Sequence, residues 1–291
     1  MANSKNNILT LNQRIEKDLN ELNTIGEIQD AKNLNGLIEA KSGQTSFATK
    51  ALPGYYAGVR NAKTVMVMLN PGEDVGKANS NLMADIQKRS MKNAGDVVNY
   101  HKWCVNYGHI DKGRQDNFDL KQAFFLNKWI GTGISLPVGL DENSDKQTKL
   151  DAKEIVLTQK LSMDMIPYAS SSFSKFTKGK VSLIFPFVET LFEEIFSHDD
   201  RYVIFCAGIF ETVFKEYDNV HPGSIKFLRK ERKLIPDSKI SGSCSIISIT
   251  YKGKTIRALI ANTFSSKALP NAFKKMEQYG EFCYNEYIKQ P

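Results

Sequence analysis

The feature that most constrains the fold of this 291-residue chain is the apolar run Thr64-Val65-Met66-Val67-Met68-Leu69. A strand with apolar side chains on both faces must be covered on both faces, which is typical of a central parallel strand buried under helices. Asn70-Pro71-Gly72 follows directly. Proline lacks an amide hydrogen and glycine tolerates positive φ, so these residues predict a sharp bend at the strand end.

Other strands and helices follow from the same kind of patterning. Strands are expected at Ser162–Ile166 and Tyr202–Cys206, and a hairpin with Gly253 in its turn is expected at Ser245–Ala261. Apolar residues at helical spacing predict helices at residues 8–24, 28–40, 96–107, 120–130, 181–196, 209–217 and 269–287. We therefore expect an α/β protein, a three-layer α/β/α sandwich with a central, mostly parallel four-stranded sheet.

The length is compatible with one large domain or two small ones. We expect residues 1–50 to form an N-terminal helical segment packed on the core. Residues 51–291 are expected to form one α/β/α domain, with a helical insertion at about residues 75–150.

Composition excludes several classes of protein. No stretch approaches the roughly 20 apolar residues that a membrane helix needs. The first residues lack the apolar core and cleavage site of a signal peptide. The four cysteines lie far apart without a Cys-x-x-Cys pair, which disfavours a metal cluster and fits free thiols in a reducing compartment. We expect a cytoplasmic protein that uses no metal, no cofactor and no membrane.

The net charge of +7 is concentrated in one segment. Residues 220–257 contain nine basic and two acidic residues, so this segment accounts for the whole excess. A concentration of basic residues in one segment is expected of a protein that binds a phosphate backbone. The alternative interpretation is that the segment is only a solvated surface hairpin. The candidate DNA-contact residues in it are Lys226, Arg229, Lys230, Arg232 and Lys233.

Candidate functional residues lie where the expected strands end. In open α/β sheets, ligands bind beyond the carboxyl ends of the strands. Asn70 occupies such a position, and its amide offers one acceptor and two donors that can orient a water or recognise the edge of a base. The alternative is that Asn70 only caps backbone groups of a turn.

The segment Tyr55–Gly72 resembles the first motif of the uracil-DNA glycosylase superfamily, in which an aromatic residue and a glycine precede a buried strand that ends in Asn-Pro-Gly. It is most similar to the mismatch-specific and single-strand-selective branches. The resemblance implies a DNA-repair hydrolase that excises uracil or a modified base without metal. In this chain it assigns Asn70 to the hydrolytic water and, for binding the base, Pro71, Gly72, Tyr56 and Tyr168.

The second motif of that family follows the last strand, where this chain has Asn262-Thr263-Phe264-Ser265-Ser266 without the usual proline. The resemblance assigns Asn262 to the base or leaving group, and Phe264 or Leu269 to the wedge that enters the duplex. Ser170, Ser265 and Ser266 are candidate phosphate contacts. His221-Pro222-Gly223-Ser224 is a rival for this motif, although it precedes the basic hairpin.

Two other functions remain open. One is a non-catalytic nucleic-acid-binding module on the same fold, which the missing proline and the basic segment would suit. The other is a hydrolase of a nucleotide or another small N-glycoside. For the glycosylase and for the binding module the expected partner is DNA, with single- and double-stranded forms both open, and no oligomeric state is predicted.

Overall fold

The computed structural model describes residues 8–40, 43–70, 79, 91–97, 117–170, 175–234, 241–262, 264 and 273–289. The chain divides into two compact units, each made of separated segments. The first unit comprises Met1–Tyr56, Leu69–Tyr100 and Asp164–Ser197, and the second comprises Ala57–Met68, His101–Met163 and His198–Pro291. The domain boundary expected at residue 50 stays a prediction.

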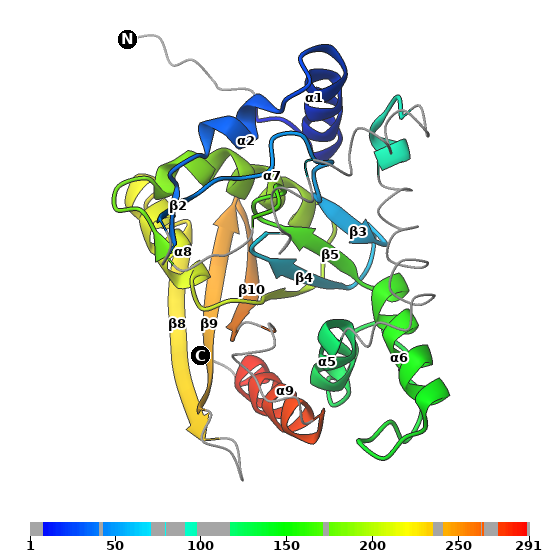
Figure 1. Cartoon of the computed structure of the whole chain (residues 1–291). Helices are drawn as coiled ribbons and strands as arrows, with labels where there is room; N and C mark the ends of the chain where they lie inside the picture. The colour runs from blue at the N-terminus through cyan, green and yellow to red at the C-terminus, as the bar shows by residue number, and fades with distance from the viewer. Residues whose placement is uncertain are drawn as a thin grey trace. The chain divides into compact units, whose positions relative to one another are not determined.

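The larger sheet has seven strands in the described part of the chain, in the order β3-β5-β4-β7-β10-β9-β8 (Figure 1). The three neighbours β4, β7 and β10 are parallel, whereas β10, β9 and β8 pair antiparallel. The strands are β3 (Tyr56–Gly58), β4 (Thr64–Met68), β5 (Leu161–Asp164), β7 (Tyr202–Phe205), β8 (Ile225–Leu234), β9 (Ser241–Tyr251) and β10 (Lys254–Ala261). The helices of the second unit are α5 (Asn117–Leu126), α6 (Lys146–Gln159), α8 (Phe210–Val220) and α9 (Phe273–Ile288).

The first unit carries a small antiparallel sheet in the order β2-β1-β6. Among its described elements are α1 (Leu11–Thr24), α2 (Gln29–Asn33), β1 (Ile38–Ala40), β2 (Gly43–Thr45), β6 (Lys175–Phe176), the short 3-10 helix η2 (Val181–Ile184) and α7 (Phe185–Ile195). Helix α1 begins with a capping box, in which Thr10 and Gln13 bond reciprocally to each other's backbone N–H.

Apolar side chains on both faces of the central strands build the core of the second unit. Met66 of β4 and Ile204 of β7 belong to a buried cluster with α5, α6 and α9. On the opposite face, the ring of Phe205 contacts Phe210 and Phe214 of α8 at centroid distances of 5.0 and 4.7 Å. Helices therefore cover both faces of the sheet, which confirms the α/β class. Among the described residues, no helix is long and apolar enough to cross a membrane.

Several details differ from the sequence-based expectation. The sheet is mixed and has more than the four strands expected. The sequence does not predict β8, because it is highly charged, or β3, because it has only three residues. The helix expected at residues 28–40 ends after Asn33, and Gly36 at φ +76° leads the chain into β1. Helix α6 is an addition to the predicted elements. Most of the helix expected at 96–107 lies outside the described residues, and membership in the uracil-DNA glycosylase fold stays a prediction.

Helices α5 and α9 are in close contact at Gly280 of α9. A Cβ atom at this position would overlap the backbone carbonyl group of Phe125 on α5. The Nε1–H of Trp129 donates to the Gly280 carbonyl at 3.0 Å, so the contact is also hydrogen-bonded. Only glycine allows this spacing between the two helices.

We expect Gly280→Ala to lower the free energy of unfolding, measured by urea denaturation, by about 1–3 kcal/mol. The reason is that the added methyl group must push two packed helix backbones apart. Gly208→Ala is the matched control, because no atom lies within 4 Å of its added Cβ, and its effect should stay within about 0.5 kcal/mol. A Gly280→Ala protein as stable as the wild type would contradict the packing described.

Candidate functional site

Asn70 follows β4 and is held by a side-chain hydrogen bond. Its Nδ2 donates to Ser170 Oγ at 2.8 Å. The neighbouring Leu69 carbonyl accepts a bond from the Ile166 N–H at 2.8 Å, so the chain after β4 and the chain after β5 are joined through backbone and side chain. Ser170 is only 2% exposed. The amide of Asn70 therefore has a fixed orientation, whereas Pro71 and Gly72 lie outside the described residues.

The segment after β5 is itself tied to other parts of the first unit. The Gly54 N–H donates to the Pro167 carbonyl at 2.7 Å, and the Ala48 N–H donates to the Ala169 carbonyl at 2.9 Å. These bonds stand on either side of Tyr168, which precedes Ser170 by two residues. The position of the Ser170 hydroxyl, and with it the Asn70 amide, thus depends on a segment with several fixed points.

Tyr168 is packed inside the first unit. Its side chain is 1% exposed, and its ring lies edge-on to Tyr55 and to Phe187 at centroid distances of 6.4 and 5.8 Å. This placement does not favour the predicted stacking on a base, because no ring face is exposed. Tyr56, the other predicted base-binding aromatic, begins β3 and is partly exposed.

A buried acid, Asp18 of α1, joins the two tyrosines. Its Oδ2 accepts hydrogen bonds from the hydroxyls of Tyr55 and Tyr168, both at 2.9 Å. Asp18 is fully buried, and its Oδ1 has no hydrogen-bond partner in the described structure. Burial raises the pKa of Asp18 to about 7, and the two tyrosine hydrogen bonds oppose that shift.

Sequence reasoning missed Asp18, although a signal for it exists. Asp18 stands three residues after Ile15 and four before Leu22, on the apolar stripe of α1. A carboxyl group on that stripe must be buried, and a buried carboxyl group needs hydrogen-bond donors. The identity of the two donors could not be read from the sequence, since they lie 37 and 150 residues away.

Asn262 directly follows β10 and takes part in a compact hydrogen-bond network of the second unit. Its Oδ1 accepts from the Ser243 hydroxyl at 2.6 Å, and its N–H donates to the Tyr279 hydroxyl at 2.6 Å. That hydroxyl in turn donates to the Ser243 carbonyl at 2.6 Å. Asn262 thus links the ends of β9 and β10 to α9.

The rest of the predicted second motif is only partly described. Phe264 is 1% exposed and packs edge-on against Phe125 at 5.0 Å, so in this structure it belongs to the core rather than to an exposed wedge. Ser265, Ser266 and Leu269 lie outside the described residues. The rival residue His221 ends α8, where its ring lies 4.4 Å from that of Tyr217 and its carbonyl accepts from the Ser224 N–H. This histidine helps to form the turn into β8.

A bulge controls how the basic residues of β8 are displayed. The pairing register with β9 shifts between Phe227 and Arg229. Lys230 then reaches Glu211 of α8 on one face of the sheet, while Arg229 reaches Glu286 of α9 on the other. Beyond the strand, Lys254 pairs with Asp199. Three of the nine basic residues of the segment are thus paired with acidic residues elsewhere in the second unit.

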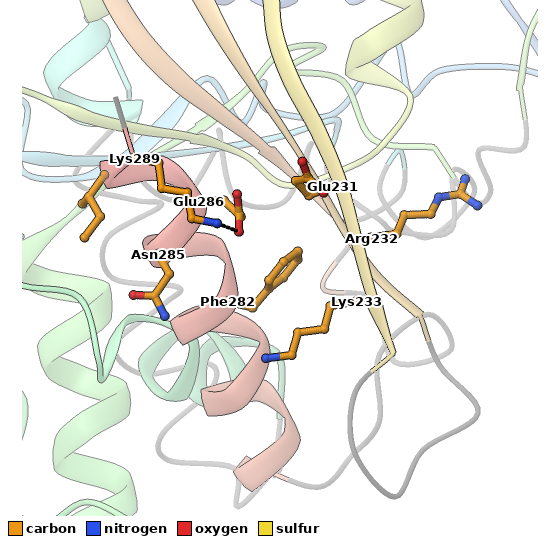
Figure 2. Close-up of a pocket in the computed structure, with 8 residues that line it drawn as sticks. Glu231, Arg232, Lys233, Phe282, Asn285, Glu286 and Lys289 are labelled. Atoms are coloured by element: carbon orange, nitrogen blue, oxygen red, sulfur yellow. Dashed lines mark hydrogen bonds and ion pairs between the residues drawn. The ribbon is translucent and has the colours of Figure 1, made fainter. Parts of the chain in front are cut away.

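A groove of about 790 Å³ lies between the end of β8 and α9 (Figure 2). Lys233 points from β8 toward α9, whereas Arg232 points away on the opposite side of the strand. Lys226, Arg232 and Lys233 make no ion pair with any described residue. The groove is lined by Glu231, Arg232, Lys233, Phe282, Asn285, Glu286, Ile288 and Lys289. Lys226, Arg232 and Lys233 therefore remain available for an anionic partner.

Metal-binding and thiol chemistry find little support among the described side chains. No group of three His, Cys, Asp or Glu residues in that part of the chain is arranged to hold a metal ion. Cys206, Cys244 and Cys283 are buried thiols. Burial raises the pKa of Cys206 and Cys283, which keeps their thiols protonated and poorly reactive.

The raised pKa of Asp18 predicts a pH-dependent stability. The folded state retains the proton between the ordinary pKa of 3.8 and about 7, so the contribution of Asp18 to the free energy of unfolding should fall as pH rises through that range. The fall amounts to roughly 4 kcal/mol. Urea denaturation from pH 4 to 8 should therefore show the stability difference between wild type and Asp18→Asn shrinking or reversing toward high pH.

Asp145→Asn serves as the control of opposite sign. Asp145 is the exposed N-cap of α6, and its hydrogen bonds to Thr148 lower its pKa. Because the pKa of Asp145 is lowered, its stabilising effect is lost only as pH falls below the ordinary pKa of 3.8, so the stability difference between wild type and Asp145→Asn should stay nearly constant from pH 4 to 8. An Asp18→Asn difference that does not change between pH 4 and 8 would disprove the assignment for Asp18.

Comparison with known proteins gives no family for this chain. A scan against protein-family models finds no match, and a search of curated proteins finds none. The chemistry of the Asn70 segment, the Asn262 network and the basic strand β8 is therefore the basis on which a function can be argued.

Proposed function

We propose that the chain hydrolyses the N-glycosidic bond of uracil or a modified base in DNA. The observation that carries this proposal is the asparagine after β4, whose amide is fixed by the 2.8 Å bond from Nδ2 to Ser170 Oγ. The resemblance of Tyr55–Gly72 to the first glycosylase motif supports the same assignment. An asparagine at a strand end is suited to chemistry only if it is held rigidly, and this one is.

The reaction asks little of the protein. Water attacks C1′ of the deoxyribose, the C1′–N bond breaks and its electron pair leaves with the base, and the proton that the water loses balances the one that the base takes up. The bond from Nδ2 to Ser170 Oγ holds the Asn70 side-chain amide in place, and we assign the orientation of the attacking water to this amide. Such prior orientation lowers the barrier because no reorganisation is needed when the bond breaks.

The nucleic acid would be gripped through its phosphates by β8. Lys226, Arg232 and Lys233 are the basic residues of this strand without an ion pair to a described residue, and Lys233 points into the groove beside α9. Arg229 and Lys230 are paired with Glu286 and Glu211, so they contribute less to an external phosphate. Phosphate contacts by Lys and Arg release counterions and make the affinity fall with salt.

A second candidate function is a nucleic-acid-binding module without catalysis. Two observations favour it. The carbonyl of the Asn262 amide is bonded to Ser243, and Phe264 is buried against Phe125, so both predicted second-motif residues serve the fold in this structure. The basic strand β8 would suffice for binding.

Catalysis is tested by incubating the protein with labelled single- and double-stranded DNA that contains uracil, hypoxanthine or a mismatch, followed by alkali cleavage of abasic sites. We expect scission by the wild type and a loss of rate of about 100-fold or more in Asn70→Ala, because the water is no longer oriented. Asn20→Ala, at an exposed position of α1, is the matched control and should retain the wild-type rate.

The other outcomes separate the alternatives. Salt-sensitive DNA binding without scission would support the binding module. Release of free base from a nucleoside or nucleotide, but not from DNA, would support a small N-glycoside hydrolase. Equal activity of wild type and Asn70→Ala would overturn the assignment of Asn70.

DNA binding is tested separately with a fluorescent oligo-dT. We expect Arg232→Ala/Lys233→Ala to bind more weakly and to lower the slope of log affinity against log salt by about 1.4, or roughly 0.7 for each phosphate that is no longer neutralised. Lys178→Ala, which removes an exposed lysine outside β8, should leave the slope unchanged. An unchanged slope in the double variant would show that DNA does not bind at this end of β8.

A further inference from the structure

Asp18 lies at one end of a continuous series of contacts that ends at Asn70. The Tyr168 hydroxyl donates to Asp18 Oδ2 at 2.9 Å, and two residues later the Ser170 hydroxyl accepts from Asn70 Nδ2 at 2.8 Å. Every residue in this series belongs to the first unit. The only covalent link that separates the two hydrogen bonds is the short segment Tyr168-Ala169-Ser170.

The start of the series is firmly anchored. On α1, Arg14 donates to the Thr190 hydroxyl and to the Pro186 carbonyl of α7 at 2.5 and 2.8 Å. Lys17 of α1 forms an ion pair with Asp30 of α2 at 2.8 Å. These contacts hold α1 in place, so we expect a change in the bonds at Asp18 to act on the two tyrosines.

The unpartnered Oδ1 makes the proton state of Asp18 consequential. An ionised carboxylate accepts both tyrosine hydroxyls through strong charge-assisted bonds but leaves a buried Oδ1 without a donor. A protonated carboxyl relieves the buried charge and weakens its bonds to the tyrosines. Burial has the largest influence on the pKa of Asp18. The hydrogen bonds from Tyr55 and Tyr168 and the charges of Lys17 and Asp30 also act on it.

We propose that Asp18 is a positioning residue that sets the orientation of the Asn70 amide through Tyr168 and Ser170, in a manner that depends on its proton. The proposal rests on the proposed function for its meaning in catalysis, because Asn70 is the residue assigned to the water. The geometric coupling itself does not require that function. Tyr168 is the mechanical link, which explains why an aromatic residue after β5 is held inside the unit.

The test follows the side-chain amide signals of Asn70 by NMR in protein labelled with ¹⁵N-asparagine, with Asn70→Ala to assign them. In the wild type we expect these signals to shift with pH, with a midpoint near the Asp18 pKa of about 7. In Asp18→Asn the shift should disappear, since the amide still accepts from the tyrosines but cannot titrate. In Tyr168→Phe the shift should also disappear, because the ring packing remains but the hydroxyl link is absent.

If Asp18 had a purely structural role, its substitution would change stability without moving the Asn70 signals. The proposal would be overturned if the Asn70 signals of folded wild type stayed constant from pH 5.5 to 8.5. A shift that persists in Tyr168→Phe would overturn it as well. If Asp18→Asn does not fold, Tyr168→Phe carries the test alone. Failure of the proposed function is distinguishable, because the NMR shift would then remain while no base is released from any DNA substrate.

The activity arm uses the scission assay. We expect the pH profile of kcat for the wild type to have an inflection near pH 7 that is absent in Asp18→Asn, with KM for DNA unchanged. An inflection retained in Asp18→Asn would assign it to another group and contradict the proposal.

Discussion

Strands β4 and β7 and the second half of β10 (258–261) are buried and largely apolar on both faces, and this constraint governs the rest of the second unit. Side chains such as Met66 and Phe205 must be shielded from opposite sides of the sheet, so helices have to cover both faces. No polar side chain can be placed in the middle of these strands at low cost. Polar groups with a task of their own are therefore confined to the positions where the strands end, which is where Asn70 and Asn262 stand.

The polar residues at the strand ends serve the fold first. Asn262 ties β9, β10 and α9 together through Ser243 and Tyr279. Asn70 joins the chain after β4 to the chain after β5 through Ser170. The two asparagines differ in which side-chain atom makes the hydrogen bond. At Asn262 the side-chain carbonyl oxygen accepts a hydrogen bond from a hydroxyl, whereas at Asn70 the side-chain nitrogen donates one to a hydroxyl.

The sequence predicts the elements whose pattern is repetitive or apolar on both faces. Helix α1, strands β4, β7 and β10 and the hairpin at Gly253 are recognisable in this way. The sequence does not reveal strand β8, because lysine and arginine on both faces obscure the alternation of apolar and polar residues that marks a strand. The burial of Tyr168 could not be predicted, since an aromatic residue after a strand gives no sign of the side it faces. Its anchoring depends on Asp18, 150 residues earlier.

The basic residues of β8 have a consequence for solubility. Strand β8 is at the edge of the sheet, and such an edge offers unpaired backbone groups to a second copy of the chain. Because neighbouring basic residues such as Arg229 and Lys230 point to opposite faces of the strand, a second β8 aligned against the first would bring like charges together whichever face it matched. The same residues that suit a phosphate backbone thereby protect the protein from edge-to-edge aggregation.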